Sequence, residues 1–129
     1  VQGDLFVVGA DLATPHIEGR GATSYVPRIG PDDIARLEGW IDEADAELPP
    51  LTTFILPSGT PAATALHVAR TVARRAERRT IAVGHVEEIS DDARIYLNRL
   101  SDLLFVWARL VNHRAGSAET PWVKADATL

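Results

Sequence analysis

The residues best suited to chemistry in this chain are arginines that share one face of a predicted helix. At about 100° per residue, a helix over residues 61–83 places Arg70, Arg74 and Glu77 within about 60° of one another, with Arg78 at the edge. Guanidinium groups offer paired planar donors to phosphate oxygens, and a nearby carboxylate can orient an arginine or accept from a ribose hydroxyl. This face suits a polyphosphate. The alternative is a solvated face held by Glu–Arg pairs at helical spacing.

A second polar stripe is predicted on the last helix. Its members lie within about 80° of one another: Asn98, Asp102, Phe105, Arg109 and Asn112. An adjacent apolar stripe suits the core: Leu97, Leu100, Leu104, Ala108 and Val111. A polar stripe flanked by apolar positions often faces a cleft or a subunit interface. An ordinary exposed face is the alternative, and the aromatic ring within the stripe favours burial.

Other residue types give weaker signals. The four histidines show no paired ligand spacing, so a metal site is not expected, and without cysteine there is no disulfide or thiolate zinc site. Phe54 lies in the apolar stretch LTTFILP and would ordinarily belong to a core. The three tryptophans do not interleave with the arginines, so a stacking platform for nucleic acid finds no support.

The charge distribution points to a local anion site in an acidic protein. The formal net charge is −5, which argues against a general preference for nucleic acid. Six of the 13 basic residues nevertheless fall in one short stretch: Arg70, Arg74, Arg75, Arg78, Arg79 and Arg94.

These residues must be positioned by helices. Apolar spacing and capping residues predict helices over 1–13, from Pro31 to the Pro49-Pro50 pair, from a Thr60 cap to about Val83, and from a Ser90 cap to about Arg114. We expect a loop over 14–30, an extended, buried connection without a partner strand over 51–57, and an irregular tail over 117–129. Residues 1–129 are therefore expected to form a single all-α helical bundle.

No apolar run approaches the roughly 20 residues that a membrane-spanning helix needs. No signal peptide is visible, which favours a cytoplasmic protein, and the absence of cysteine fits a reducing compartment. Because the chain begins at Val1, in the middle of a helical pattern, we expect that it continues upstream, so an organellar targeting segment remains an open alternative.

Four segments, in order, resemble the PduO-type ATP:cob(I)alamin adenosyltransferases, also called corrinoid adenosyltransferases. The combination of RTxxRRAER with YLNRLSDxLF is highly specific, and the likeness extends over nearly the whole chain. The segments are Asp11–Pro15 (DLATP), Leu48–Gly59 (LPPLTTFILPSG), Leu66–Arg79 (LHVARTVARRAERR) and Tyr96–Asn112 (YLNRLSDLLFVWARLVN).

The resemblance implies a five-helix bundle that assembles as a homotrimer, with an active site at each subunit interface. It implies that ATP, with Mg²⁺, binds beside the corrin ring of cobalamin. Phe54 would lie against the lower face of the corrin, where it displaces the dimethylbenzimidazole ligand. Phe54, Arg70 and Arg74 would be the catalytic residues. The residues expected at the nucleotide are Arg70, Arg74, Arg75, Glu77, Arg78, Asn98 and Arg99.

The chain departs from the family pattern at its start. The family's glycine- and threonine-rich loop, of the TRTGDxGxT type, and its first helix are absent, so we expect this chain alone to bind ATP poorly. Ser58 also stands where the family more often has glycine.

Two other functions are weighed: a non-catalytic protein that delivers adenosylcobalamin to a mutase or dehydratase, and a purely structural helical oligomer. Neither nucleic acid nor a membrane is an expected partner.

Overall fold

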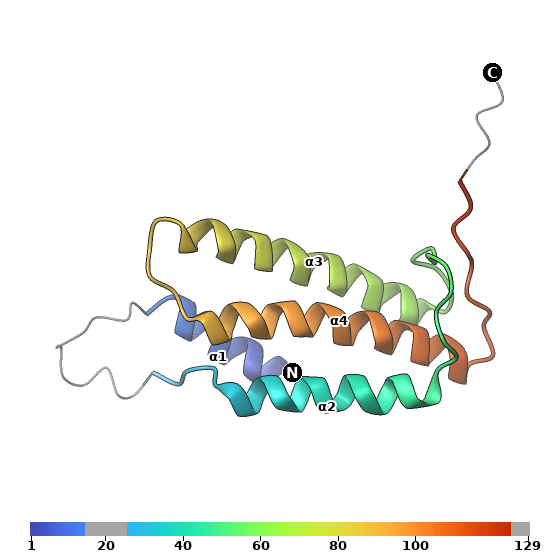
Figure 1. Cartoon of the computed structure of the whole chain (residues 1–129), viewed down its shortest axis with the longest axis horizontal. Helices are drawn as coiled ribbons and strands as arrows, with labels where there is room; N and C mark the ends of the chain where they lie inside the picture. Colours follow the sequence, from blue (N-terminus) through green and yellow to red (C-terminus); the bar gives the residue numbers. More distant parts are fainter. Residues whose placement is uncertain (15–25, 125–129) are drawn as a thin grey trace, which may run out of the picture.

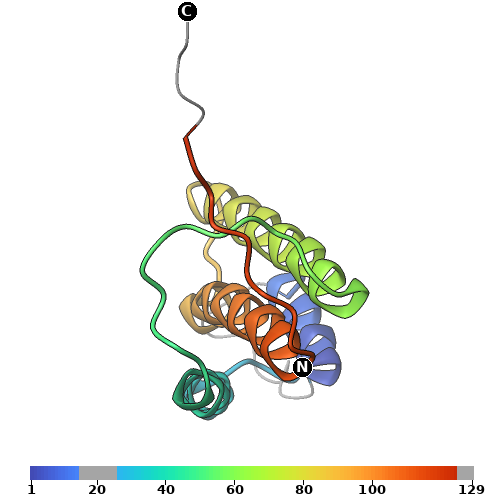
Figure 2. The same ribbon diagram turned by 90° about the vertical axis from the view of Figure 1, so that its right-hand side faces the viewer.

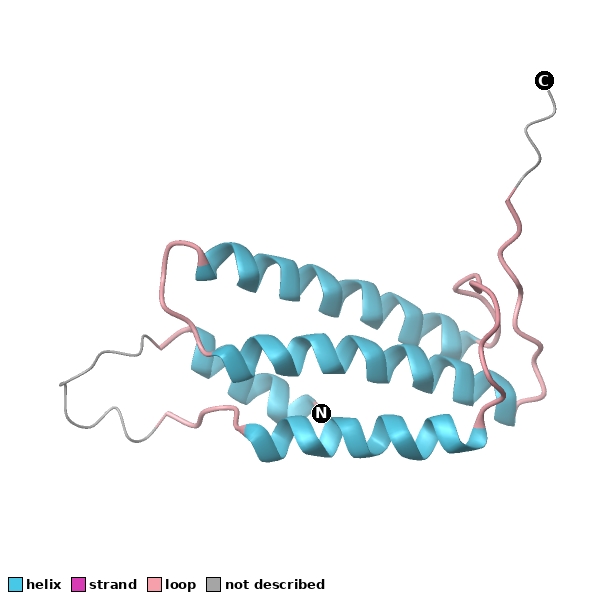
Figure 3. Ribbon diagram, viewed as in Figure 1, coloured by secondary structure: helices cyan, strands magenta, loops and turns pink. Residues whose placement is uncertain are grey.

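A computed structural model describes residues 1–14 and 26–124, and in these ranges the chain forms four α-helices and no strand (Figures 1 and 3). The helices are α1 (Gln2–Leu12), α2 (Pro31–Glu47), α3 (Pro61–Gly84) and α4 (Asp91–Arg114). All four predicted helices are confirmed, with ends that differ by only a few residues from the predicted ones. In the part of the chain that is described, no helix is long and apolar enough to cross a bilayer.

Local capping explains why the two long helices begin where they do. The Thr60 hydroxyl accepts from the N–H of Ala63 at 3.2 Å, and the Ser90 hydroxyl accepts from the N–H of Ala93 at 3.2 Å. Each bond satisfies one of the donors that the first helical turn leaves without a partner. Because these caps involve residues close together in the chain, the sequence predicts both starts correctly.

Helix α4 is the centre of the bundle and packs against the other three helices (Figure 2). Leu97, Leu100, Leu104 and Ala108 are buried, as predicted. Their main partners from the other helices are also buried: Val8 of α1, Leu37 of α2 and Ala73 of α3. Burial of this apolar surface favours the all-α bundle that the periodicity predicts.

A buried carboxylate joins the end of α1 to the start of α2. Asp11 is 1% exposed, and its Oδ1 accepts from Arg28 Nη1 at 2.8 Å while its Oδ2 accepts from the N–H of Ile29 at 3.0 Å. The same Arg28 nitrogen donates to the backbone carbonyls of Asp11 and Thr14. These bonds fix both ends of the predicted loop over 14–30. Its residues 15–25 lie outside the described residues, and they include Pro15 of the DLATP motif and His16.

The prediction of a buried connection over 51–57 is wrong. This segment is extended, but Leu51 is 42% exposed, Phe54 79% and Leu56 41%. It crosses from α2 to α3 at one end of the bundle (Figure 1). The α4 side chains that bond to its two ends, Arg109 and Asn112, are polar. It also has a partner, since Ile55 forms an isolated antiparallel bridge with Pro121. The tail is therefore not wholly irregular, and its residues 125–129 lie outside the described part.

Candidate functional site

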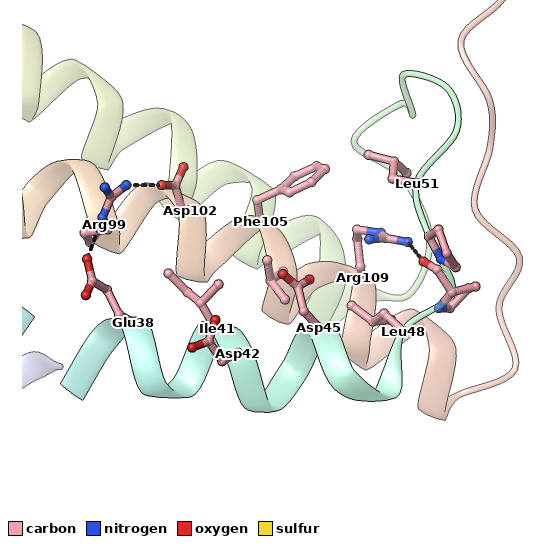
Figure 4. Close-up of a pocket in the computed structure, with 13 residues that line it drawn as sticks. Glu38, Ile41, Asp42, Asp45, Leu48, Leu51, Arg99, Asp102, Phe105 and Arg109 are labelled. Atoms are coloured by element: carbon pink, nitrogen blue, oxygen red, sulfur yellow. Dashed lines mark hydrogen bonds and ion pairs between the residues drawn. The ribbon is translucent and has the colours of Figure 1, made fainter. Parts of the chain in front are cut away.

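A groove of about 800 Å³ runs between α2, α4 and the start of the 51–57 connection (Figure 4). From α4, Asp102, Phe105 and Arg109 line it, so three members of the predicted polar stripe face a groove. Glu38 and Ile41 of α2 form part of the opposite wall. The groove combines an aromatic ring and aliphatic surface with charged groups, which is the composition of a site for an organic ligand.

Arg99 lies at one end of this groove and is held by carboxylates. Its Nε is 3.0 Å from Glu38 Oε1 and its Nη1 is 3.1 Å from Asp102 Oδ2. The hydrogen bond to Glu38 is the main reason that the pKa of Arg99 is raised, so the guanidinium stays charged. Arg99 also donates to Asn98 Oδ1 at 3.3 Å. Asn98 and Arg99 are both predicted nucleotide residues, and this hydrogen bond connects Asn98 to the groove.

Arg109 lies at the other end and is 5% exposed. Its Nε is 2.6 Å from Glu119 Oε1, and its Nη2 donates to the Pro49 carbonyl at 2.9 Å. Asn112, one turn further along α4, is 3% exposed. An exposed polar face, the alternative for this stripe, is therefore wrong for both residues, because both side chains are buried and hydrogen-bonded.

The arginine face of α3 carries positive charge that no carboxylate of the described residues pairs with. Arg74, Arg75 and Arg78 are exposed, and no carboxylate lies within 4.0 Å of their guanidinium groups in the described ranges 1–14 and 26–124. Glu77 instead accepts from Asn98 Nδ2 of α4 at 2.8 Å. The alternative of Glu–Arg pairs along α3 is therefore not what the described residues show. Clustered, unneutralised guanidinium groups attract anions.

Two contacts join this face to α4. The Glu77–Asn98 hydrogen bond is one, and the other places the Arg70 guanidinium carbon 5.0 Å from the centroid of the Phe105 ring, a cation–π contact. Phe105 also lines the groove, so the arginine face and the groove share this residue. Phe54 belongs to a different element, the connection between α2 and α3, and its ring is exposed.

Sequence reasoning missed several residues that shape the site. Glu38 and Glu119 hold the two groove arginines, yet they are 61 and 10 residues away from them and belong to no recognisable pattern. Asp11 falls within the DLATP motif, but only its burial identifies it as an anchor. For Glu38, Glu119 and Asp11, the sequence shows an acidic residue but does not indicate which group it bonds to.

His67 is expected to make the stability of the fold depend on pH. It is 5% exposed on α3, edge-on to Phe105 with ring centroids 6.3 Å apart, and desolvation, followed by the charge of Arg70, lowers its pKa. As the pH falls below about 6.5, the unfolded chain therefore binds more protons than the folded one, and stability declines until the lowered pKa is reached.

We expect His67→Leu to lose less stability than the wild type between pH 7 and pH 5, by at most about 1.4 kcal/mol per pH unit. Urea unfolding at a series of pH values checks this, and parallel curves for the two proteins would contradict it.

Comparison with known proteins agrees with this arrangement. Residues 1–111 match the sequence profile of the family described as cobalamin adenosyltransferase. The chain is 50% identical over 115 residues to the corrinoid adenosyltransferase of Mycobacterium tuberculosis, covering 87% of this chain and 58% of that protein. It is 42% identical over 126 residues to the corrinoid adenosyltransferase of Homo sapiens, covering 98% and 50% respectively.

Solved structures give the same result. A variant of the PduO-type ATP:corrinoid adenosyltransferase from Lactobacillus reuteri, complexed with cobalamin and ATP, superposes with a TM-score of 0.83 at 38% identity, over 94% of this chain and 65% of that one. A second variant, complexed with ATP, has a TM-score of 0.85 over 95% and 66%. The chain thus spans between half and two thirds of the proteins it matches. Since its profile match, its helical arrangement and its arginine motif all agree, the chain belongs to the cobalamin adenosyltransferase family.

Proposed function

We propose that this chain is part of a corrinoid adenosyltransferase, which transfers the 5′-deoxyadenosyl group of ATP to the cobalt of cob(I)alamin. The observation that carries this proposal is the arginine cluster on α3, which forms no ion pair with the described carboxylates and is joined through Glu77 and Asn98 to the helix that lines the groove. Family membership supports the same activity. The most direct rival is a protein that holds adenosylcobalamin and delivers it without forming it.

The reaction is a nucleophilic displacement at carbon. Cobalt(I) donates its electron pair to C5′ of ATP and forms the cobalt–carbon bond, while the bond between C5′ and the triphosphate oxygen breaks and the triphosphate leaves with its electron pair. No proton has to be moved, so the protein needs no general base. It must align the two substrates and stabilise negative charge on the triphosphate as it leaves.

The arginine face is suited to that second task. We assign Arg70 and Arg74 to catalytic contacts with the triphosphate, because guanidinium groups bind phosphate oxygens through paired hydrogen bonds. Asn98 and Glu77 hold the nucleoside, and their mutual hydrogen bond at 2.8 Å keeps both side chains oriented before ATP arrives. The remaining residues that we assign to the nucleotide pocket are Arg75, Arg78 and Arg99.

Phe54 is suited to the corrin. Its ring is 79% exposed on an extended segment, so a ligand or a partner subunit can cover it and bury its apolar surface. Against the lower face of the corrin it would exclude the dimethylbenzimidazole ligand. Cobalt(II) without a lower axial donor is easier to reduce, because that donor raises the energy of the orbital that accepts the electron. Phe54 would then favour formation of cobalt(I).

The described residues contain no cluster of three or more His, Asp or Glu side chains able to hold a metal ion. We therefore propose that Mg²⁺ enters with ATP, since magnesium commonly binds through phosphate oxygens and water with few protein ligands. Bound there, it would neutralise charge on the triphosphate.

The proposal extends to assembly and to the missing part of the site. The active protein is a homotrimer in which a segment preceding this chain supplies the triphosphate loop and a fifth helix to a single-domain bundle. It acts in the cytoplasm and passes its product to a cobalamin-dependent mutase or dehydratase.

The test is the visible spectrum of full-length protein incubated with reduced cobalamin and MgATP. We expect adenosylcobalamin and triphosphate to form in equal amounts, because each displacement makes one of each. If adenosylcobalamin binds but never forms, the delivery function replaces the proposed one. If neither ATP nor corrinoid binds, the structural oligomer replaces both.

A further inference from the structure

Phe54 lies on a segment that helix α4 holds at both ends. Upstream of the ring, Arg109 Nη2 donates to the Pro49 carbonyl at 2.9 Å. Downstream of it, the Asn112 carboxamide bonds to the turn formed by residues 58–60. Arg109 and Asn112 are three residues apart and therefore neighbours on one helix face. Between these two attachments the segment is largely exposed, so the contacts at its ends contribute to the position of the ring.

The Asn112 attachment uses both halves of the amide. Its Oδ1 accepts from the N–H of Thr60 at 3.0 Å, and its Nδ2 donates to the carbonyl of Ser58 at 2.9 Å. Asparagine carries one acceptor and one donor group at this length, and neither aspartate nor leucine does. Since the side chain is 3% exposed, water cannot easily replace either bond.

Gly59, between the two bonded residues, fits closely against the same side chain. Its φ is +119°, a conformation that other residues rarely adopt. A Cβ atom at this position would overlap both Oδ1 and Nδ2 of Asn112. The turn and the carboxamide are therefore closely packed, so a shift of one would move the other.

The tail completes the support. The Leu56 N–H donates to the Thr120 carbonyl at 2.8 Å, and the Trp122 N–H donates to the Phe54 carbonyl at 2.7 Å. These bonds hold the backbone on both sides of Ile55, whereas the Asn112 bonds fix the turn that leads into α3. Because Thr60 also caps α3, the turn connects the Phe54 segment to the helix of Arg70 and Arg74.

We propose that Asn112 is a positioning residue for Phe54. This proposal rests on the proposed function, in which Phe54 contacts the corrin. Its carboxamide holds the 58–60 turn against α4, and this fixes the ring relative to the arginine face. Asn112 itself touches neither substrate. Its loss therefore affects the corrin and the chemical step while leaving the affinity for nucleotide unchanged.

The experiment compares Asn112→Asp with the wild type in full-length protein. Aspartate keeps the shape and the acceptor, loses the donor and places negative charge against the Ser58 carbonyl. We expect the four-coordinate fraction of bound cobalt(II) corrinoid, read from its absorption and electron paramagnetic resonance spectra, to fall about tenfold, and kcat with it. The Kd for MgATP should stay within about twofold of the wild-type value.

Val8→Ala is the matched control, because it truncates the core on α1 and touches neither attachment. It separates loss of positioning from loss of general stability. The proposal is overturned if Val8→Ala lowers the four-coordinate fraction equally, or if Asn112→Asp leaves that fraction unchanged.

A ligand-independent readout separates this proposal from the proposed function. With Phe54 replaced by 4-fluorophenylalanine, Asn112→Asp should shift the ¹⁹F resonance in the absence of any ligand, and Val8→Ala should not. If the wild type forms no adenosylcobalamin, the proposed function fails, and the ¹⁹F comparison alone decides whether Asn112 positions the ring. An unchanged resonance in Asn112→Asp overturns the positioning role.

Discussion

Replacing Phe54 with alanine is expected to abolish the four-coordinate cobalt(II) signal in the presence of ATP and to lower kcat about 100-fold, the equivalent of roughly 2.7 kcal/mol in the barrier. Alanine leaves room below the corrin for a water molecule or for the dimethylbenzimidazole ligand. The cobalt then keeps an axial donor and is harder to reduce. Absorption and electron paramagnetic resonance spectra of the bound corrinoid, together with the rate of adenosylcobalamin formation, measure both effects.

Phe6→Ala is the control that the structure offers for this substitution. Phe6 is 80% exposed on α1 and Phe54 is 79% exposed, so each change removes an exposed ring of the same size. Neither should unfold the protein, because an exposed side chain contributes little to the core. If Phe6→Ala reproduces the loss, or if Phe54→Ala retains the four-coordinate signal, the role assigned to Phe54 is wrong.

The helices of this chain could be predicted because their signals are local. Thr60 and Ser90 each bond to an N–H three residues ahead, and the apolar stripe of α4 repeats along a single helix. Contacts within one turn depend on nothing that lies far away in the sequence. The helix ends, the all-α class and most of the core therefore follow from spacing alone.

The environment of Phe54 could not be predicted in the same way. The apolar composition of LTTFILP indicates burial, but burial requires apolar surface opposite the segment, and at this end α4 presents Arg109 and Asn112. Pro121, which forms the isolated bridge with Ile55, lies in a tail without any strand pattern. Exposure and pairing here depend on how distant segments meet.

For the candidate site, the sequence predicts which side chains share a helix face but not which partners they bond to. The helical periodicity places Arg70, Arg74 and Glu77 together, and the structure keeps them on one helix face. That Glu77 would bond to Asn98 rather than to an arginine depends on the packing of α3 against α4. The groove likewise arises from the spacing between α2 and α4, which no single segment encodes.

Arg74→Ala is expected to raise the Kd for MgATP about 10- to 100-fold in full-length protein, while the affinity for the corrinoid stays the same. A charge-assisted hydrogen bond to phosphate contributes about 1.5–3 kcal/mol. Arg74 is exposed and has no carboxylate partner within 4.0 Å among the described residues, so its removal breaks no ion pair of that part of the chain. Isothermal titration with MgATP measures the change.

Arg79→Ala and Arg74→Lys make this test specific. Arg79 is also an exposed arginine on α3 but points about 140° away from Arg74, so its loss should leave the Kd for MgATP unchanged. Lysine keeps the charge and loses the paired planar donors, so Arg74→Lys should fall between the wild type and Arg74→Ala. Equal weakening by Arg74→Ala and Arg79→Ala would mean that α3 attracts nucleotide through general positive charge. A change in oligomeric state without any change in Kd would instead assign Arg74 to contacts between subunits, and the nucleotide site would have to lie elsewhere.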